Sequence, residues 1–347
     1  MNPTTRFLNA CYAKPVDRPP VWLMRQAGRY MDSYQAVRKR VSFMELCRTP
    51  ELACEVTMMP IEQLGVDAAI LFSDILVPLE PMGVKVWFDG GPQIAPPVRC
   101  PADVDALRVE GVADDVGYVY EAIGLIRKAI ASRELPLLGF SGSPWTLASY
   151  LIEGGTSRNH HELKRMMFAE PAALHRLLDK LATVVSAYLR RQIEAGVHAV
   201  QIFDTWGVLL DRTTWEAFSG HYTARIMREL ADCGVPLIHY TKGTHLLASA
   251  AALPCDVVSV DWTVELGPLR QQLGPGRGIQ GNIDPAVMRA PDAVIEDAVR
   301  RCLEAHGPGP GHIVNFGHGI TPDANVDSAR HLVETVQELG VAFGGAP

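Results

Sequence analysis

The sequence lacks long apolar runs and an apolar leader. Its longest purely apolar stretches are about as long as residues 68–72, whereas roughly 20 such residues are needed to span a bilayer. Residues 1–14 are mixed and polar, without the apolar centre of a secretory signal. We therefore expect a protein that has no membrane partner and stays in the cytoplasm.

Paired cysteines, excess basic charge and cofactor motifs are also missing. The seven cysteines are scattered and form no C-x-x-C pair, which argues against a disulfide framework or a zinc ribbon. The formal net charge of −7 opposes general nucleic-acid binding, because that mode needs a net basic face. No G-x-x-x-x-G-K-[ST], no G-x-G-x-x-G that opens a helix after a strand, and no H-E-x-x-H occurs. We expect no cofactor and no metal, so an enzyme of this kind would draw its electron sink from the substrate.

The chain is rich enough in apolar residues, at 48% hydrophobic and 20% charged, to bury a large core. Eight short apolar or β-branched runs alternate with helical segments, and they lie at 21–24, 68–72, 136–140, 199–203, 236–239, 256–260, 278–281 and 312–316. Nearly continuous hydrophobicity is typical of parallel strands that are covered on both faces. This order favours the α/β class and a (β/α)8 TIM barrel, in a single domain over residues 1–347. A doubly wound sheet is the competing architecture.

Local signals add a hairpin and several helix boundaries. Residues 84–98, with Asp-Gly-Gly at 89–91, predict a β-hairpin inserted after the second strand. Apolar spacing over 174–193 predicts a helix that opens near Pro171 and ends at Gly196, and 294–302 predicts a second one between Pro291 and Gly307. Thr49-Pro50-Glu51 predicts a capped helix start, with the helix running toward Gly65.

Polar residues follow most of the predicted strands. In a barrel, chemistry gathers where strands end at the C-terminal face. The residues found there are Arg25, Asp74, Ser141, Asp204, Thr205, His239, Thr241, Asp261, Asn282 and His318. Loops are polar in general, so a single such position carries little weight. Lys242 is the one lysine that follows a strand, and it permits a Schiff base without supporting one.

Four residues at or near the predicted strand ends could contact a ligand. Arg25 and Arg29 lie four residues apart and could grip carboxylates by bidentate hydrogen bonds, although Arg–Asp salt bridges within the loop explain them equally well. Asp74 stands between apolar residues, so its carboxylate needs either arginine partners or the N–H groups of a ligand. His318 lies between two glycines, where the backbone could approach a ligand or hold a phosphate.

Four stretches resemble one family. Residues 20–30 (PVWLMRQAGRY), 72–76 (FSDIL), 142–150 (GSPWTLASY) and 315–320 (NFGHGI) are similar to stretches of the uroporphyrinogen decarboxylases of the haem pathway. They occur in the same order and span nearly the whole chain. The resemblance implies a (β/α)8 barrel, a homodimer, and a cofactor-free decarboxylation that converts the four acetate arms of uroporphyrinogen III to the methyl groups of coproporphyrinogen III.

The resemblance also implies roles for individual residues. It makes Arg25, Asp74 and Tyr150 catalytic, and it makes Arg25, Gln26, Arg29, Asp74, Tyr150, Thr205 and His318 substrate-binding. Asp74 would accept hydrogen bonds from the pyrrole N–H groups, and Arg25 is also implied in proton delivery. Because the pKa of arginine lies above about 12, we assign Arg25 mainly to carboxylate positioning. Thr205 stands where the family commonly has serine.

Two further expectations concern charge and rival functions. The basic residues of the first fifty positions, which include Arg38, Lys39, Arg40 and Arg48, are expected to attract an acidic substrate. A corrinoid or thiol methyltransferase with the same barrel is one rival, but such enzymes use a His-x-Cys zinc element where this chain reads His239-Tyr240-Thr241. A non-catalytic tetrapyrrole-binding protein is the other rival.

Overall fold

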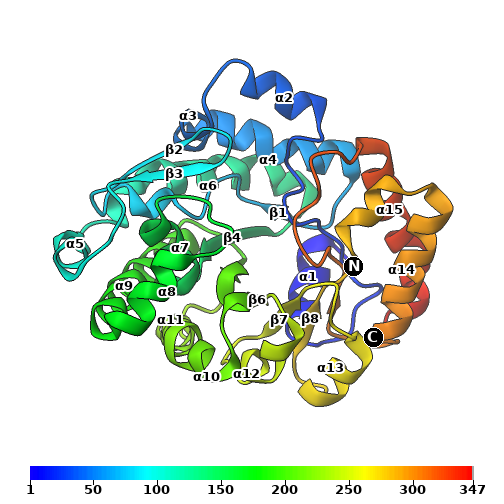
Figure 1. Cartoon of the computed structure of the whole chain (residues 1–347). Helices are drawn as coiled ribbons and strands as arrows, with labels where there is room; N and C mark the ends of the chain where they lie inside the picture. The colour runs from blue at the N-terminus through cyan, green and yellow to red at the C-terminus, as the bar shows by residue number, and fades with distance from the viewer. Residues whose placement is uncertain (346–347) are drawn as a thin grey trace.

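The computed structural model describes residues 1–345 and contains a curled sheet of seven parallel strands. The strands follow one another as neighbours in the order β1 (Ala69–Ile70), β4 (Leu137–Gly142), β5 (Ala199–Asp204), β6 (Leu237–Thr241), β7 (Val257–Val260), β8 (Gly278–Gln280) and β9 (His312–Ile313). Helices surround the sheet on its outside (Figure 1). This is the α/β arrangement with parallel strands that the alternating pattern predicts.

The expected strand at residues 21–24 is not formed, so the prediction of eight strands is wrong in one. Val21 makes only an isolated parallel bridge with Val314. On its other side, its carbonyl accepts from Asp67 N (2.8 Å), and its N–H bonds to a side-chain oxygen of Asp67 (2.9 Å). The ladder stops after Trp22 because the N–H of Met24 bonds to Asn315 Oδ1 (2.8 Å). The segment thus lies between the two edge strands without being a strand.

Fifteen α-helices occur within residues 1–345. They are α1 (Pro3–Cys11), α2 (Asp32–Arg38), α3 (Phe43–Arg48), α4 (Pro50–Leu64), α5 (Pro101–Ala106), α6 (Gly117–Ile130), α7 (Pro144–Glu153), α8 (His161–Ala169), α9 (Pro171–Glu194), α10 (Arg212–Trp215), α11 (His221–Leu230), α12 (Leu247–Ala251), α13 (Leu266–Leu273), α14 (Asp292–His306) and α15 (Val326–Leu339). The predicted boundaries of α4, α9 and α14 are confirmed. The side chain of Thr49 makes no cap bond, however, because its hydroxyl donates to Glu45 O (2.8 Å). None of the described helices is long and apolar enough to cross a membrane.

A two-stranded antiparallel hairpin stands apart from the main sheet. It consists of β2 (Lys85–Phe88) and β3 (Pro92–Ala95), in the register Lys85 opposite Ala95. Its base is tied to the end of α7, since Ile94 N donates to Gly154 O (2.9 Å). The hairpin therefore has a fixed place beside the strand ends near α7.

The interior of the curl is closed at its N-terminal end. Phe7 and Ala10 of α1 share a buried cluster with residues that begin the strands, among them Ala68, Leu138 and Ile238. The larger core lies between the sheet and the outer helices. Because α1 fills the N-terminal end of the curl, a cavity inside the curl can open only at the carboxyl ends of the strands.

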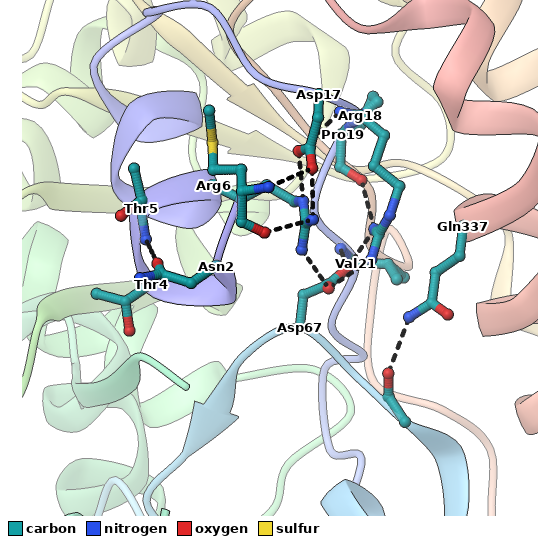
Figure 2. A network of polar contacts seen from close by, with 12 residues as sticks. Asn2, Thr4, Thr5, Arg6, Asp17, Arg18, Pro19, Val21, Asp67 and Gln337 are labelled. Carbon is teal, nitrogen blue, oxygen red and sulfur yellow. Dashed lines mark hydrogen bonds and ion pairs between the residues drawn. The ribbon is translucent and has the colours of Figure 1, made fainter. Parts of the chain in front are cut away.

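Charged residues reinforce the same N-terminal end (Figure 2). Asp67 accepts two hydrogen bonds from Arg18 (2.7 Å each) and one from Arg6 (3.2 Å). Arg6 also binds Asp17 through Nε and Nη2 (2.7 Å each). The side chains of Arg6 and Asp67 are only 9% and 4% exposed, so the Arg6–Asp67 pair is buried. They fasten α1 and the Val21 segment to the start of β1.

Candidate active site

A cavity of about 620 Å³ opens at the carboxyl ends of the strands. Its wall is built from the turn around residues 24–30, from α2, from the segment after β1, and from the tip of the hairpin. All seven predicted site residues line it, namely Arg25, Gln26, Arg29, Asp74, Tyr150, Thr205 and His318. Residues almost 300 positions apart in the sequence therefore share one space.

Arg25 and Arg29 present free guanidinium groups to this cavity. Within residues 1–345, neither side chain makes an ion pair or a hydrogen bond, so the alternative of loop-fastening salt bridges is wrong. Arg25 has the left-handed φ of 63°, a conformation that is unfavourable for a residue with a side chain and that recurs at functional sites. Its side chain lies against Gly319, where an added Cβ would collide with Arg25 Cδ. The fold thus keeps both charges unpaired and makes room for one of them.

Asp74 lies on the segment that leaves β1. Its Oδ1 accepts a hydrogen bond from Leu76 N (2.8 Å), and it forms no ion pair with any described residue. Burial raises the pKa of Asp74, while the Leu76 bond and the charge of Arg25 act in the opposite direction. The carboxylate therefore has an oxygen free to accept an N–H from a ligand, and it gains stability when positive charge develops nearby.

Tyr150 and Thr205 stand on neighbouring elements. Tyr150 belongs to α7, and its ring packs at 6.3 Å on that of Trp206, the residue after Thr205. Burial raises the pKa of Tyr150, so its hydroxyl stays protonated at neutral pH. Thr205 follows β5 directly and is half-buried. Both residues offer a hydroxyl to a ligand on the side of the cavity that faces α7.

His318 supplies a neutral imidazole. Its Nδ1 accepts the N–H of Gly319 (2.8 Å), which leaves the proton of the neutral ring on Nε2. Burial, followed by the charges of Arg25 and Lys242, lowers the pKa of His318 to about 4. His318 is therefore a hydrogen-bond donor at neutral pH and adds no cation to the cavity.

Gln26 lies in the cavity wall, and its side chain is bonded to the backbone. Its side chain is buried in the wall, where Oε1 accepts from Leu23 N (3.1 Å) and Nε2 donates to Ala68 O (3.1 Å). Tyr30 adds a bond to the carbonyl of Gln26 (2.6 Å). With its amide bonded to the backbone on both sides, Gln26 holds the turn that carries Arg25, and its contact with a substrate stays a prediction.

Some of the basic residues near α2 line the cavity, and others form ion pairs away from it. Arg38 lines the cavity and lies over the ring of Phe43 (5.7 Å). Arg40 pairs with Glu55 instead, and Arg48 pairs with Glu80. Of the four residues expected to attract a substrate, only Arg38 belongs to the cavity wall, and Lys39 lies exposed beside it.

The sequence analysis missed an aromatic lining. Five phenylalanine rings line the cavity together with Tyr30, Tyr34 and Tyr150, and they are Phe43, Phe72, Phe88, Phe140 and Phe203. Phe43 and Phe88 pack at 4.4 Å, and Phe140 and Phe203 pack at 5.8 Å. Part of this lining could have been predicted from side-chain alternation along the strands. Phe140 and Phe203 point to the same face of their strands as Leu138 and Ala199, which belong to the interior cluster. A cavity with apolar walls and unpaired cations fits a large, partly apolar anion.

These features define a barrel-like α/β protein with a ligand cavity for an acidic small molecule. The chain belongs to the uroporphyrinogen decarboxylase (URO-D) family, whose model matches residues 2–339. A uroporphyrinogen decarboxylase of Pelobacter propionicus is 48% identical over 96% of this chain and 98% of that protein. One of Geobacter metallireducens is 50% identical over the same shares of the two chains.

A solved structure shares the fold at low identity. The methyltransferase from Methanosarcina mazei superposes with a TM-score of 0.81 at 20% identity, and the match covers 98% of this chain and 99% of that one. The likeness concerns the fold alone. His239, which begins the His-Tyr-Thr triplet, is fully buried and does not line the cavity.

Proposed function

We propose that this protein is a uroporphyrinogen decarboxylase, which removes the four acetate carboxyl groups of uroporphyrinogen III as CO2 and leaves coproporphyrinogen III. One observation carries the proposal: two unpaired arginines and a half-buried aspartate without an ion-pair partner face one aromatic-lined cavity. A tetrapyrrole with eight carboxylates and a ring of inner N–H groups matches these features. The family membership supports the same substrate.

The chemistry needs an electron sink, which the pyrrole itself provides. A proton adds to the ring carbon next to the one that bears the acetate, and the ring becomes a conjugated iminium cation. The C–C bond to the carboxylate then breaks, CO2 leaves, and the electron pair neutralises the cation as an exocyclic methylene. A proton adds to this methylene and the ring proton leaves, so that acetate has become methyl with one net proton consumed.

Asp74 is the residue that favours this path. A carboxylate beside the pyrrole nitrogens stabilises the cationic ring more than the neutral one, which is selective transition-state binding. Burial strengthens this effect, because the same burial that raises the pKa of Asp74 reflects a poor solvation of its charge. The interaction of Asp74 with the substrate is therefore strongest in the cationic ring that forms before CO2 is lost.

The remaining residues orient the macrocycle. Arg25 and Arg29 bind peripheral carboxylates through paired hydrogen bonds. Tyr150, Thr205 and the Nε2 of His318 offer further polar contacts. None of these assignments requires Arg25 to give up its proton.

We also propose the finer architecture that the family implies. The segment around Val21 acts as the eighth member of a closed (β/α)8 barrel wall, which the hydrogen bonds of Val21 to both edges support. The chain would form one domain over residues 1–347 and work as a homodimer in the cytoplasm. Sedimentation of the purified protein tests the dimer.

The test of the function is direct. The purified protein is incubated with uroporphyrinogen III without oxygen, and the products are oxidised and separated by chromatography. We expect porphyrins with seven, six, five and then four carboxylates. A protein that binds the substrate but leaves eight carboxylates intact would be a carrier, and the proposed reaction would be rejected.

A further inference from the structure

Lys242 lies on the opposite side of the strand ends from Arg25. It directly follows β6, the middle strand of the seven, whereas Arg25 follows the segment between the two edge strands. In a curled sheet, the middle strand stands across from the place where the edges meet. The two cations therefore approach the same central space from opposite sides.

Lys242 follows the inward-facing residues of β6. Ile238 belongs to the interior cluster, and Tyr240, two residues later, packs against Phe203 (5.9 Å) and His318 (6.2 Å), which both line the cavity. Side chains alternate along a strand, and Lys242, one residue past the end of β6, comes two residues after Tyr240 and so has the parity of Ile238 and Tyr240. It stands one step above Tyr240, toward the open end.

The charge of Lys242 is uncompensated. Within residues 1–345 its ammonium makes neither an ion pair nor a hydrogen bond, although the residue is half-buried. Asp261, at the end of the neighbouring β7, is occupied by neutral donors: Gly243 N (2.6 Å), Thr263 N (2.7 Å) and the Thr263 hydroxyl. A partly buried cation without a partner costs stability, which an anionic ligand would offset.

The loop that carries Lys242 is held firmly. Gly243 has a φ of 98°, and an added Cβ would lie 2.9 Å from the ring of His245 and 3.1 Å from Val208. Its N–H is fixed by Asp261. Lys242 also lies near enough to His318 for its charge to help lower the pKa of that imidazole. The ammonium is therefore within electrostatic range of a residue of the cavity wall, although Lys242 itself is not among the residues that line the cavity.

We propose that Lys242 binds a carboxylate of the acidic macrocycle on the side of the cavity opposite Arg25 and Arg29. The inference rests on the proposed function for the kind of ligand, and it adds a contact from a second side. A macrocycle held by cations at both ends cannot slide along the aromatic walls. Lys242 then contributes to affinity and orientation, and takes no part in bond breaking.

The test measures binding separately from turnover. The probe is uroporphyrin III, the oxidised macrocycle with eight carboxylates, and the Kd is measured by equilibrium dialysis at low and high salt. The variants are K242Q, which removes the charge, and K242R, which keeps it. K128Q, an exposed lysine on α6, is the matched control. Thermal unfolding of each variant reports folding.

A single charged hydrogen bond corresponds to about a tenfold change in Kd. We expect K242Q to bind about tenfold more weakly and with a flatter salt dependence, and K242R and K128Q to bind like the wild type. Wild-type affinity in K242Q would overturn the inference. Binding by K242R as weak as that by K242Q would also overturn it, because charge would then not be the cause. A wild type that binds the probe but decarboxylates nothing removes the proposed reaction and leaves the role of Lys242 intact.

Discussion

The two ends of the curled sheet use the same residue types in opposite ways. At the N-terminal end, Arg6 and Arg18 are paired with Asp67 in a buried network (Figure 2). At the C-terminal end, Arg25 and Arg29 form no ion pair with any acid among residues 1–345. All four arginines belong to the first thirty residues of the chain. Pairing therefore separates the charges that hold the fold from the charges that are available to a ligand.

The aspartates at the two ends of the sheet also differ, in the direction in which their pKa values are shifted. Arg6 holds the pKa of Asp17 well below its ordinary value through direct hydrogen bonds. Burial without a partner raises the pKa of Asp74. A carboxylate whose ionised form is stabilised by a fixed partner suits a structural role. A carboxylate whose ionised form is destabilised gains free energy when a positive charge develops on a ligand beside it.

Asp67→Ala should produce the largest effect, and it should fall on stability. The substitution leaves two buried guanidinium groups short of their partner, for which a loss of about 3–5 kcal/mol in the free energy of unfolding is typical. Urea denaturation at pH 7 measures it. Turnover per folded molecule should remain near that of the wild type. A variant as stable as the wild type would show that the network contributes nothing to the fold.

Asp74→Asn should show the reverse pattern. Loss of the carboxylate should lower kcat about 10²- to 10³-fold, the range seen when one electrostatic contact to a transition state is removed, with a smaller change in KM. Steady-state decarboxylation measures both. Asp105→Asn, on the exposed face of α5, is the control and should keep full activity. An Asp74→Asn protein with wild-type kcat would contradict the catalytic role.

Arg29→Ala should act mainly on binding. Removing one charged partner of a carboxylate corresponds to about a ten- to hundredfold rise in KM, while kcat changes less. The KM of the wild type should also rise with salt, and that rise should be less steep in the variant. A fall in kcat with an unchanged KM would transfer Arg29 from binding to catalysis.

The smallest effect concerns stability against pH. The pKa of Asp74 is higher in the folded state than its ordinary value of 3.8, so the unfolded chain loses this proton first as the pH rises. The contribution of Asp74 to stability therefore falls as the pH rises through this interval and stays low above it. Asp74→Asn should be more stable than the wild type at pH 7, with the advantage shrinking toward pH 4. Urea midpoints across this range measure the difference.

Much of the fold was predictable because parallel strands and helix ends have local signals. The runs behind β4, β5, β6 and β7 are mostly apolar, and Gly65 ends α4 with a left-handed φ of 71°. The strand predicted at residues 21–24 is not formed, because side chains bind backbone N–H groups that a neighbouring strand would otherwise bind. Asp67 takes the N–H of Val21 and Asn315 takes that of Met24, and nothing in the apolar run 21–24 reveals this.

The site was predictable to the extent that its motifs are contiguous. Arg25, Asp74 and His318 follow predicted strands and Arg29 lies in the turn after Arg25, so the rule of the C-terminal face brings them together. The motif did not reveal that the amide of Gln26 bonds to the backbone of Leu23 and Ala68. The pairing of Arg48 with Glu80 and the aromatic lining depend on tertiary contacts that spacing does not contain.

The central claim is that Arg25 and Arg29 are kept unpaired to hold an acidic macrocycle. Equilibrium titration of uroporphyrin III into the Arg25→Ala/Arg29→Ala double variant tests it most directly, with circular dichroism to confirm that the protein is folded. The account predicts a Kd at least about a hundredfold above that of the wild type, since two charged contacts are lost. A folded double variant that binds uroporphyrin III as tightly as the wild type would contradict it.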